Sequence, residues 1–440
     1  MIIAIVGRAN VGKSTLFNAL AGENISIVQD TPGVTRDRIY ATSTWLDRSF
    51  TIVDTGGIEP DSKELIPKKM REQAEIAIET SDVIIFVTDV KQGVTDQDVQ
   101  VASILRKSGK PVVLCVNKVD DYVRLQADVY EFYNLGIGEP VAVSAIMKKG
   151  LGDLLERAFE FAKNEGAEEE EDDRPKIAVV GKPNVGKSSL INRLANEERV
   201  IVSDVAGTTR DAIDTVIKKD GKEYVFIDTA GLRRKSRIKE EIERYSIIRA
   251  VSAVERADVV ILMLDASEGV SEQDAKIAGI AHERGKGVII AVNKWDAVEK
   301  NDKTIYKFSE EIKKTLSFMP YAQLLFISVK TGQRVDKLFD LVDTVINNQN
   351  LRIATGVLNE IISEAVVMQQ PPSDKGKRLK VFYATEVSVK PPTFVIFVNS
   401  KELMHFSYVR YLENRIRDAF GFIGTPLKFV IRERGGKENA

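Results

Sequence analysis

The amino-acid sequence predicts two consecutive α/β domains, each with a mostly parallel sheet covered by helices on both faces, followed by a small α+β domain. Two observations indicate the pair. A glycine-rich segment, GRANVGKST from Gly7, returns as GKPNVGKSS from Gly181. Each copy also begins a series of short apolar, β-branched runs that alternate with amphipathic stretches, which is typical of a sheet buried on both faces. A third observation separates the end of the chain, where the order of the expected elements changes.

Two further motifs repeat in the same order and at nearly the same interval. VDTGG, with Asp54, returns as IDTAG, with Asp228, and NKVD at Asn117 returns as NKWD at Asn293. Three ordered repeats at one spacing indicate that a whole domain is duplicated. We therefore expect a first domain over residues 1–163, a linker over 164–174, a second domain over 175–350 and the small domain over 351–440.

The first copy begins with the strand IIAIVG, passes through the glycine-rich loop and enters a helix near Ser14. FTIVDT, VIIFVTD and PVVLCVNK are further expected strands, and Val99–Lys107 is an expected amphipathic helix. The second copy repeats the series with KIAVVG, YVFIDT, VVILMLD and GVIIAVNK. Every repeated motif lies where a strand ends, and sheets of this kind bind ligands at the carboxyl ends of their strands.

The linker contains the acidic run NEGAEEEEDD, from Asn164 to Asp173. A run of like charges repels itself and cannot bury apolar surface, so we expect an extended tether. A docking strip for a basic surface is the alternative interpretation.

The C-terminal part predicts a helix over Ala354–Val367, two strands joined at Lys390-Pro391-Pro392, a helix over Ser407–Ala419 and a last strand in PLKFVIRE. From residue 351 onwards there are 14 lysines and arginines against 9 aspartates and glutamates, while the whole chain has a net charge of −2. A basic end on an acidic protein favours an anionic partner, although a solvated surface gives the same excess.

Composition excludes several classes of protein. The chain of 440 residues fits about three domains. No run of about 18 apolar residues occurs, so we expect no membrane span, and the N-terminal apolar stretch has no basic segment before it, so we interpret it as a strand and not as a signal peptide. One cysteine, Cys115, and two distant histidines, His282 and His405, argue against disulfides and a zinc site and fit a reducing cytoplasm.

The glycine-rich segment has the form G-x-x-x-x-G-K-S in both copies. Its glycines let the backbone N–H groups surround phosphates at the start of a helix. Lys13 and Lys187 are expected to reach the β- and γ-phosphates, and Ser14 and Ser188 to bind Mg²⁺.

The second motif, D-x-x-G, ends a strand with Asp54 or Asp228, where the carboxylate can hold Mg²⁺ through water. Gly57 and Gly231 can then offer a backbone N–H to the γ-phosphate. Thr35 and Thr209 lie between the first two motifs, in the position of a switch threonine that joins Mg²⁺ and responds to the γ-phosphate.

The third motif, N-K-x-D, predicts guanine. The carboxylate of Asp120 or Asp296 can accept hydrogen bonds from the ring N–H and the exocyclic amine of guanine, a donor pair that adenine lacks. The asparagine and lysine of each motif would support the loop and cover the base. A backbone N–H after Ser144 or Ser328 could meet the guanine oxygen, so both sites should prefer GTP to ATP.

In the first copy, the residues expected to contact nucleotide are Gly7, Arg8, Ala9, Asn10, Val11, Gly12, Lys13, Ser14, Asp54, Gly57, Ile58, Asn117, Lys118, Asp120, Ser144 and Ala145. In the second copy they are Gly181, Lys182, Pro183, Asn184, Val185, Gly186, Lys187, Ser188, Asp228, Gly231, Leu232, Asn293, Lys294, Asp296, Ser328 and Val329. The residues expected to act in hydrolysis are Lys13, Thr35, Gly57, Lys187, Thr209 and Gly231. The expected Mg²⁺ ligands are Ser14, Thr35, Asp54, Ser188, Thr209 and Asp228.

Together these motifs, with TRD in both copies and the α+β tail, closely resemble the EngA/Der family of bacterial ribosome-assembly GTPases over essentially the whole chain. The resemblance implies two P-loop GTPase domains, a K-homology-like tail, and a role in maturing the large ribosomal subunit through nucleotide-dependent docking on ribosomal RNA. It also implies a potassium ion beside the phosphates, held by Asn10 and Asn184. The alternative is that both asparagines only hold the loop by hydrogen bonds.

Two features depart from related families. Ras-like GTPases place a water-orienting glutamine just after D-x-x-G, where this chain has Ile58 and Leu232, so we expect slow hydrolysis without an activator. An RNA-gripping K-homology domain carries G-x-x-G between two helices, whereas Gly421-Phe-Ile-Gly424 lies between the last helix and the last strand. The tail therefore either contacts RNA or packs against a GTPase domain.

We expect a cytoplasmic, monomeric GTP switch that binds the large ribosomal subunit and its RNA, without a DNA or membrane partner. The alternative is a nucleotide-gated scaffold for protein or membrane partners whose tail docks on protein. A P-loop kinase is excluded because N-K-x-D belongs to guanine switches and no acceptor domain is present.

Overall fold

The computed structural model describes residues 1–22, 40–46, 48–55, 66–164, 172–197, 214–227, 242–299, 301, 303–374 and 377–434. The chain folds into two compact units. One comprises Met1–Asp173 with Ile238–Ser252, and the other comprises Arg174–Arg237 with Ala253–Ala440. Within the described ranges, every helix is too short or too polar to cross a bilayer.

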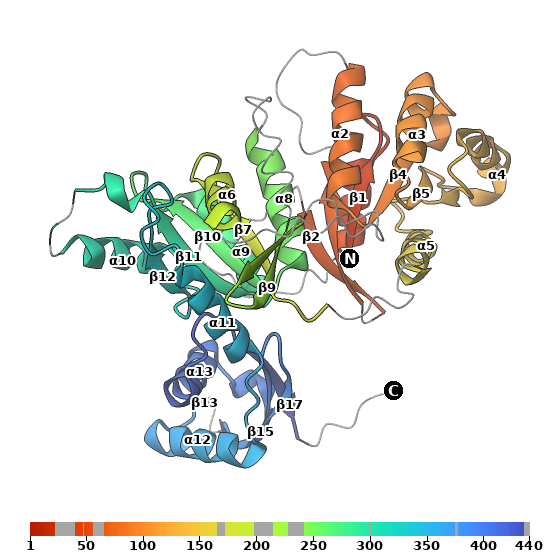
Figure 1. Cartoon of the computed structure of the whole chain (residues 1–440). Helices are drawn as coiled ribbons and strands as arrows, with labels where there is room; N and C mark the ends of the chain where they lie inside the picture. The colour runs from red at the N-terminus through yellow and green to blue at the C-terminus, as the bar shows by residue number, and fades with distance from the viewer. Residues whose placement is uncertain are drawn as a thin grey trace. The chain divides into compact units, whose positions relative to one another are not determined.

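The first α/β domain, which carries the labels β1, β2, β4 and β5 in Figure 1, has a six-stranded sheet in the order β2-β3-β1-β4-β5-β6. All its neighbouring strands run parallel except β2, which pairs antiparallel with β3. The strands are β1 (Ile2–Val6), β2 (Tyr40–Trp45), β3 (Arg48–Asp54), β4 (Val83–Asp89), β5 (Val112–Asn117) and β6 (Val141–Ala142). The helices are α1 (Lys13–Ala21), α2 (Ile66–Thr80), α3 (Asp96–Ser108), α4 (Tyr122–Tyr130) and α5 (Leu151–Asn164).

Helices cover both faces of this sheet because alternate residues of each strand point to opposite sides. Ile3 and Ile5 of β1 belong to a core with apolar residues of α1 and α5. Ala4 and Val6 belong to a second core with residues of α2, α3 and α4. Every residue of β1 and β4 is buried, which is why these strands read as unbroken apolar runs.

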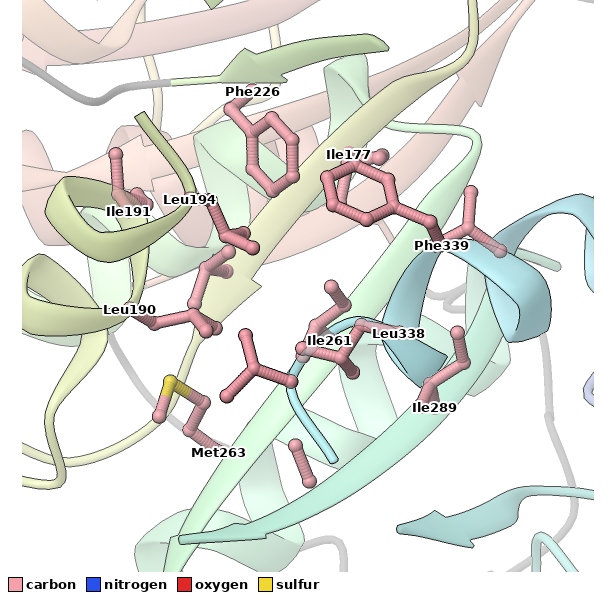
Figure 2. Close-up of a cluster of buried hydrophobic side chains, with 14 of the residues drawn as sticks. Ile177, Leu190, Ile191, Leu194, Phe226, Ile261, Met263, Ile289, Leu338 and Phe339 are labelled. Atoms are coloured by element: carbon pink, nitrogen blue, oxygen red, sulfur yellow. The ribbon is translucent and has the colours of Figure 1, made fainter. Parts of the chain in front are cut away.

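The second α/β domain repeats this topology with the strand order β12-β11-β10-β7-β9-β8, where only β8 runs antiparallel to its neighbour. The strands are β7 (Lys176–Val180), β8 (Thr215–Lys219), β9 (Lys222–Ile227), β10 (Val259–Asp265), β11 (Gly287–Asn293) and β12 (Gln323–Phe326). The helices are α6 (Lys187–Glu197), α9 (Glu272–Glu283), α10 (Thr304–Thr315) and α11 (Lys337–Gln349). A further helix of this copy, α8 (Ile242–Arg256), is divided between the two compact units after Ser252. Figure 2 shows the core between this sheet and two of the helices, to which Leu190 and Leu194 of α6, Leu338 and Phe339 of α11 and Ile261 of β10 contribute.

The tail is a three-stranded sheet in the order β15-β16-β17 with helices packed on it. Its elements are α12 (Thr355–Met368), the short strands β13 (Ser373–Asp374) and β14 (Lys377–Arg378), β15 (Val381–Ser388), β16 (Thr393–Val398), α13 (Phe406–Phe420) and β17 (Lys428–Glu433). β15 pairs antiparallel with β16, and β16 pairs parallel with β17. The two P-loop-type α/β domains and the small α+β tail confirm the predicted fold class.

The tail packs on the second α/β domain through its G-x-x-G loop. The amide of Gly424 donates to the carbonyl of Tyr321 at 2.8 Å, and the carbonyl of Gly424 accepts from the amide of Val288 at 2.7 Å. Asn348 Nδ2 donates to the Ile423 carbonyl at 2.9 Å, and Phe422 has no exposed surface. Of the two interpretations of the tail, the structure supports packing for this loop.

A partly buried aromatic and charged cluster reinforces that contact. His282 Nδ1 lies 2.9 Å from the Tyr321 hydroxyl. The Arg417 guanidinium lies 5.0 Å from the centre of the Tyr321 ring and donates to the carbonyls of Phe422 and Thr425 at 3.0 and 2.9 Å. Arg417 therefore holds the turn that presents Gly424 to the second domain.

Candidate nucleotide sites

The glycine-rich loop of the first domain follows β1 and ends where α1 begins. A Cβ atom on Gly7 would lie 2.4 Å from the Val87 carbonyl oxygen of β4, so the close approach of the two strands excludes a side chain there. Gly12 has a φ of 94°, in the left-handed region that favours glycine. Gly181 and Gly186 repeat both features, with a Cβ-to-Met263 oxygen distance of 2.4 Å and a φ of 103°. Both loops therefore have the same backbone.

The two P-loop lysines are buried and held by the loop that they follow. Lys13 Nζ donates to the carbonyl oxygens of Gly7 and Arg8 at 2.8 and 2.9 Å. Lys187 Nζ donates to Gly181 at 2.6 Å and also to Lys182. Each ammonium group is thus placed inside the loop, at the start of a helix whose N-terminal N–H groups favour anions.

Oxygen donors converge beside the first loop. Ser14 Oγ donates to Asp54 Oδ2 at 3.0 Å, and Asp54 is the buried last residue of β3. A hydroxyl and a carboxylate oxygen are ligands that Mg²⁺ prefers, so this pair fits that ion. Ser188 occupies the corresponding place at the start of α6, and its expected partner Asp228 lies outside the described residues.

One asparagine joins the two halves of each site. Asn117 Nδ2 donates to the Val11 carbonyl of the glycine-rich loop at 2.9 Å, and its Oδ1 accepts from the Ala145 amide at 3.1 Å. Asn293 makes the same two contacts, with Val185 at 2.8 Å and with Val329 at 2.9 Å. Because both asparagines are almost fully buried, they fix the phosphate loop and the expected guanine loop relative to each other.

The N-K-x-D aspartates are oriented by serines of the neighbouring loop. Ser144 Oγ donates to Asp120 Oδ1 at 2.9 Å, and Ser328 Oγ donates to Asp296 Oδ1 at 2.6 Å. In the first domain Lys91 Nζ also donates to Asp120 Oδ2 at 2.8 Å. The hydrogen bond from Lys91, and then that from Ser144, lower the pKa of Asp120, so this carboxylate is ionised and able to accept at neutral pH.

The N-K-x-D lysines have partners that sequence reasoning did not predict. Lys118 Nζ donates to Asp89 Oδ2 and to the Asn10 carbonyl, both at 2.7 Å. Lys294 Nζ lies 2.5 Å from Asp265 Oδ2. Asp89 and Asp265 are the buried last residues of β4 and β10. An aspartate at the end of the corresponding strand in both copies was the signal available in the sequence.

A second contact that was not predicted ties each glycine-rich loop to the helix that follows the fourth strand of its domain, α3 or α9. Arg8 Nε donates to Asp98 Oδ2 at 3.3 Å, and Asp98 is fully buried in the capping box that starts α3. In the second copy Lys182 Nζ lies 3.8 Å from Asp274 Oδ2, and Asp274 caps α9 in the same way. The repeat of GVTDQD as GVSEQD was visible in the sequence.

A contact of Arg193 is particular to the second site. Arg193 of α6 donates from Nη1 to the carbonyl oxygens of Val329 and Lys330, at 2.9 and 3.3 Å. This side chain connects the helix that follows the phosphate loop to the loop that carries Ser328. In the first domain the corresponding residue of α1 is Ala19, which has no side chain able to make such a contact.

The candidate potassium ligands share an unusual backbone. Asn10 and Asn184 have φ values of 65° and 64°, and both side chains are exposed. In the part of the chain that the structure describes, neither side-chain amide makes a hydrogen bond, which gives no support to the interpretation that they only hold the loop.

Several expected site residues lie outside the described residues, so the structure does not place them. They are Thr35, Gly57, Ile58, Thr209, Asp228, Gly231 and Leu232. All the other expected nucleotide contacts lie at the carboxyl edge of one of the two sheets, in the loops described above.

Comparison with known proteins agrees with this arrangement. A family model described as "50S ribosome-binding GTPase" matches residues 2–118 and again 176–294. A second model, "KH-domain-like of EngA bacterial GTPase enzymes, C-terminal", matches residues 352–432.

The chain is 70% identical to GTPase Der of Agathobacter rectalis over 438 residues, which is 100% of this chain and 99% of that protein. It is likewise 70% identical to GTPase Der of Lachnoclostridium phytofermentans over 438 residues, with the same coverage, and 59% identical to that of Acetivibrio thermocellus over 433 residues, 98% of each chain. Two matches to one GTPase model, one match to the C-terminal model and full-length identity place this chain in the EngA/Der family of bacterial GTPases, with two GTP-binding P-loop domains and a KH-like C-terminal domain.

Proposed function

We propose that this GTPase acts in the assembly of the large ribosomal subunit, which it binds through ribosomal RNA in a manner gated by nucleotide. The observation that carries the proposal is the repeated bridge made by Asn117 and Asn293, which in both domains holds the phosphate loop and the expected guanine loop in the arrangement that one nucleotide would need. The description of the matching family model as ribosome-binding supports the choice of partner.

In each site, the orientation of the N-K-x-D aspartate indicates where the guanine base would bind. Asp120 and Asp296 would accept from the ring N–H and the exocyclic amine of guanine, while Ser144 and Ser328 hold one oxygen of each carboxylate in place. The backbone amides of Ala145 and Val329 lie beside these carboxylates, where they donate to Asn117 and Asn293. An adenine base would leave the aspartate without donors, which costs several kcal/mol at order of magnitude.

The P-loop lysine and the N-terminus of the following helix indicate where the phosphates would bind. Lys13 and Lys187 would leave the loop carbonyls that they now contact and meet the β- and γ-phosphates. Ser14 and Asp54, with Ser188 and Asp228 in the second copy, would hold Mg²⁺, which neutralises phosphate charge when bound. We assign the switch threonines Thr35 and Thr209, and the backbone N–H groups of Gly57 and Gly231, to sensing the γ-phosphate.

Hydrolysis in this proposal is slow without an activator, because Ile58 and Leu232 cannot orient a water molecule. The amide oxygens of Asn10 and Asn184 would hold a potassium ion, whose charge beside the phosphates replaces that of an arginine finger. The nearly equal φ values of the two residues and their exposed side chains support this assignment.

We further propose domain limits of 1–163, 175–350 and 351–440 with an acidic linker over 164–174. The proposal includes a cytoplasmic monomer that binds neither DNA nor membranes.

The test is co-sedimentation of the full chain with ribosomal subunits in GDP, in a non-hydrolysable GTP analogue and without nucleotide, at two salt concentrations. Binding to large subunits that depends on the analogue and weakens with salt is the expected result. Lack of binding in every state would overturn the ribosomal role and leave the nucleotide-gated scaffold for protein partners.

A further inference from the structure

One end of the tail sheet collects exposed aromatic and basic side chains. At this end β15 begins, and β16 and β17 finish, because Val381 pairs with Val398 and Val398 pairs with Glu433. The six residues that gather there are Lys380, Phe382, Tyr383, Phe397, Arg432 and Arg434, which we call the tail platform.

Two aromatic rings of the platform stack across the strands. The ring centres of Tyr383 and Phe397 are 4.3 Å apart and their planes differ by 15°. Among the described residues β15 is an edge strand, whose outer edge is met by Asn359 of α12 at Ala384, so no described strand lies beside the ring face of Tyr383 that is turned away from Phe397. Tyr383 remains 39% exposed and Phe382 remains 42% exposed. Large apolar rings left in solvent at a sheet edge are typical of a surface that binds something.

Basic side chains surround these rings. Phe397 is in register with Arg432 of β17, so Tyr383, Phe397 and Arg432 form one row across the sheet. The Arg434 guanidinium lies 5.4 Å from the centre of the Phe382 ring. Lys380 precedes β15 and is held there by its amide, which donates to Asn399 Oδ1 at 2.8 Å. Among the described residues, Lys380, Arg432 and Arg434 make no ion pair with an acidic group.

The nearest acidic residue does not cancel this charge on the platform. Glu433 alternates with Arg432 and Arg434 along β17, so its side chain leaves the opposite face of the sheet. Its Oε1 accepts from the amide of Lys401 at 2.6 Å. The platform therefore presents three positive groups next to three aromatic rings.

We propose that the tail platform binds single-stranded RNA, with a base stacked on the free face of Tyr383 and phosphates beside Lys380, Arg432 and Arg434. The proposal rests on the proposed ribosomal function and names the surface that it uses. Unpaired nucleotides offer a flat apolar base and a phosphate at short intervals, and this is the combination that the platform can receive. A duplex keeps its bases stacked inside and could use only the basic groups.

The G-x-x-G loop cannot serve this purpose in this chain. Gly424 is hydrogen-bonded on both sides to the second α/β domain, and Phe422 is fully buried. The tail platform is separate from this loop, because its residues lie in β15, β16 and β17 or directly adjoin them.

A purely structural role or an acidic protein partner would give the platform different properties. A stacked pair such as Tyr383 and Phe397 also stabilises a sheet by itself. An acidic protein segment would bind the basic groups and make little use of the rings. Variants that separate ring stacking from charge distinguish these cases from RNA binding.

The experiment measures binding of the full chain to a fluorescein-labelled, unstructured 12-nucleotide RNA and to the same sequence as a duplex, by anisotropy over a series of salt concentrations. We expect preference for the single strand. Tyr383→Ala should weaken its binding by roughly five- to hundredfold, while Tyr383→Trp should retain binding. Arg432→Gln should reduce the slope of log K against log salt by about 0.7.

Matched controls lie on the helical side of the tail. Phe406→Ala removes a ring that is 56% exposed at the start of α13, and Arg410→Gln removes an exposed charge from the same helix. Both should bind RNA like the parent chain. Urea unfolding of each variant shows whether a loss of binding is a loss of folding, and Tyr383→Trp keeps the test valid if Tyr383→Ala is unstable.

Several results would overturn the platform. They are equal or tighter binding of the duplex, no RNA binding by the parent chain, equal losses in Tyr383→Ala and Phe406→Ala, or displacement of the RNA by an oligoglutamate peptide at similar concentration. Subunit co-sedimentation of the parent chain separates the two proposals. If nucleotide-dependent co-sedimentation persists while the RNA assay fails, only the platform is wrong, and if co-sedimentation fails, the ribosomal function is wrong.

Discussion

Arg193 and Val329 are joined by a hydrogen bond of 2.9 Å from the guanidinium Nη1 to the carbonyl oxygen. Since α6 begins with the P-loop lysine and Val329 donates its amide to Asn293, this bond closes a ring of contacts around the second nucleotide site. Ala19 occupies the corresponding position in the first domain. The two sites thus share their motifs and differ in how firmly the guanine loop is attached.

Replacing Arg193 should weaken nucleotide binding at the second site alone. Arg193→Ala removes donors to two carbonyl oxygens, and we expect GDP affinity to fall by up to about tenfold, since hydrogen bonds to a charged group contribute about 1.5–3 kcal/mol and only part of this acts on the nucleotide. Fluorescent GDP titration in an Asp120→Asn background would report the second site. Arg193→Lys keeps the charge but not the planar set of guanidinium donors, so its GDP affinity should lie between those of the parent chain and Arg193→Ala. Unchanged GDP affinity in Arg193→Ala would show that this contact is not needed.

Exchanging the N-K-x-D aspartates should separate the two GTPase activities. In Asp120→Asn or Asp296→Asn the new amide presents one acceptor and one donor, which matches xanthine and opposes the amine of guanine. We expect GTP affinity at that site to fall by at least tenfold and xanthosine triphosphate to be accepted in its place. Turnover of each nucleotide by the two single variants then gives the rate of each domain. Retention of full GTP binding by either variant would contradict the assignment of its aspartate.

Potassium dependence tests Asn10 and Asn184. Asn10→Ala and Asn184→Ala should each abolish the stimulation of one site by KCl relative to NaCl, with a loss of turnover on the order of tenfold to hundredfold. Alanine is strained at positive φ, so Asn10→Gly and Asn184→Gly serve as controls that keep the backbone unstrained and also lack the amide. All four variants should bind GDP nearly as well as the parent chain. A potassium response that survives in the glycine variants would show that the asparagines are not ligands.

Acid should weaken the folded second unit through His282. Burial, with a smaller effect of the Arg417 charge, lowers the pKa of His282 to about 4, below its usual 6.5. Between pH 6.5 and about 4 the unfolded chain therefore takes up a proton that the folded chain does not. The neutral, buried His282 favours the folded state fully above pH 6.5, and the free energy of unfolding falls as the pH falls towards 4. At about 1.4 kcal/mol per pKa unit this amounts to roughly 3 kcal/mol.

Urea unfolding at pH 7.5, 6 and 5 would check this effect of pH on the free energy of unfolding. His282→Gln should show a shallower decline than the parent chain. His405→Gln, at an exposed histidine, should decline like the parent and controls for the change in charge. Identical pH dependence in the two variants would contradict the role given to His282.

Sequence reasoning reached the parts of the sites that depend on local order. Asp54 and Asn117 end apolar strands, and this is enough to place them at one edge of a parallel sheet. The antiparallel edge strands β2 and β8 were not predicted, because the polar runs YATSTW and TVIKK lack the apolar continuity of the central strands. Burial on both faces leaves a clear pattern in a sequence, and an edge strand does not.

Contacts between distant side chains were beyond local patterns. Arg193 meets a loop that is 136 residues away in the chain, and nothing near Arg193 in the sequence indicates that loop. The same holds for the tail, where Gly421 and Gly424 were recognised but their partners Tyr321 and Val288 depend on how two finished domains fit together. Asp89 and Asp265 could have been recognised as site residues, because both copies of the duplicated domain have an aspartate at the end of the corresponding strand. Their lysine partners could not have been inferred in this way.

Strand β11 has a mechanical consequence. Its second residue, Val288, is bonded to Gly424 of the tail, and its last residue, Asn293, holds the guanine loop of the second site. Four residues of extended chain lie between the two, so the strand spans roughly 17 Å from one to the other. The strand lies between β10 and β12 and could slip only by breaking its register with both. A force applied to the tail along this axis is therefore transmitted through β11 to the loop that holds the base. The second nucleotide site is in this way mechanically coupled to any partner that the tail binds.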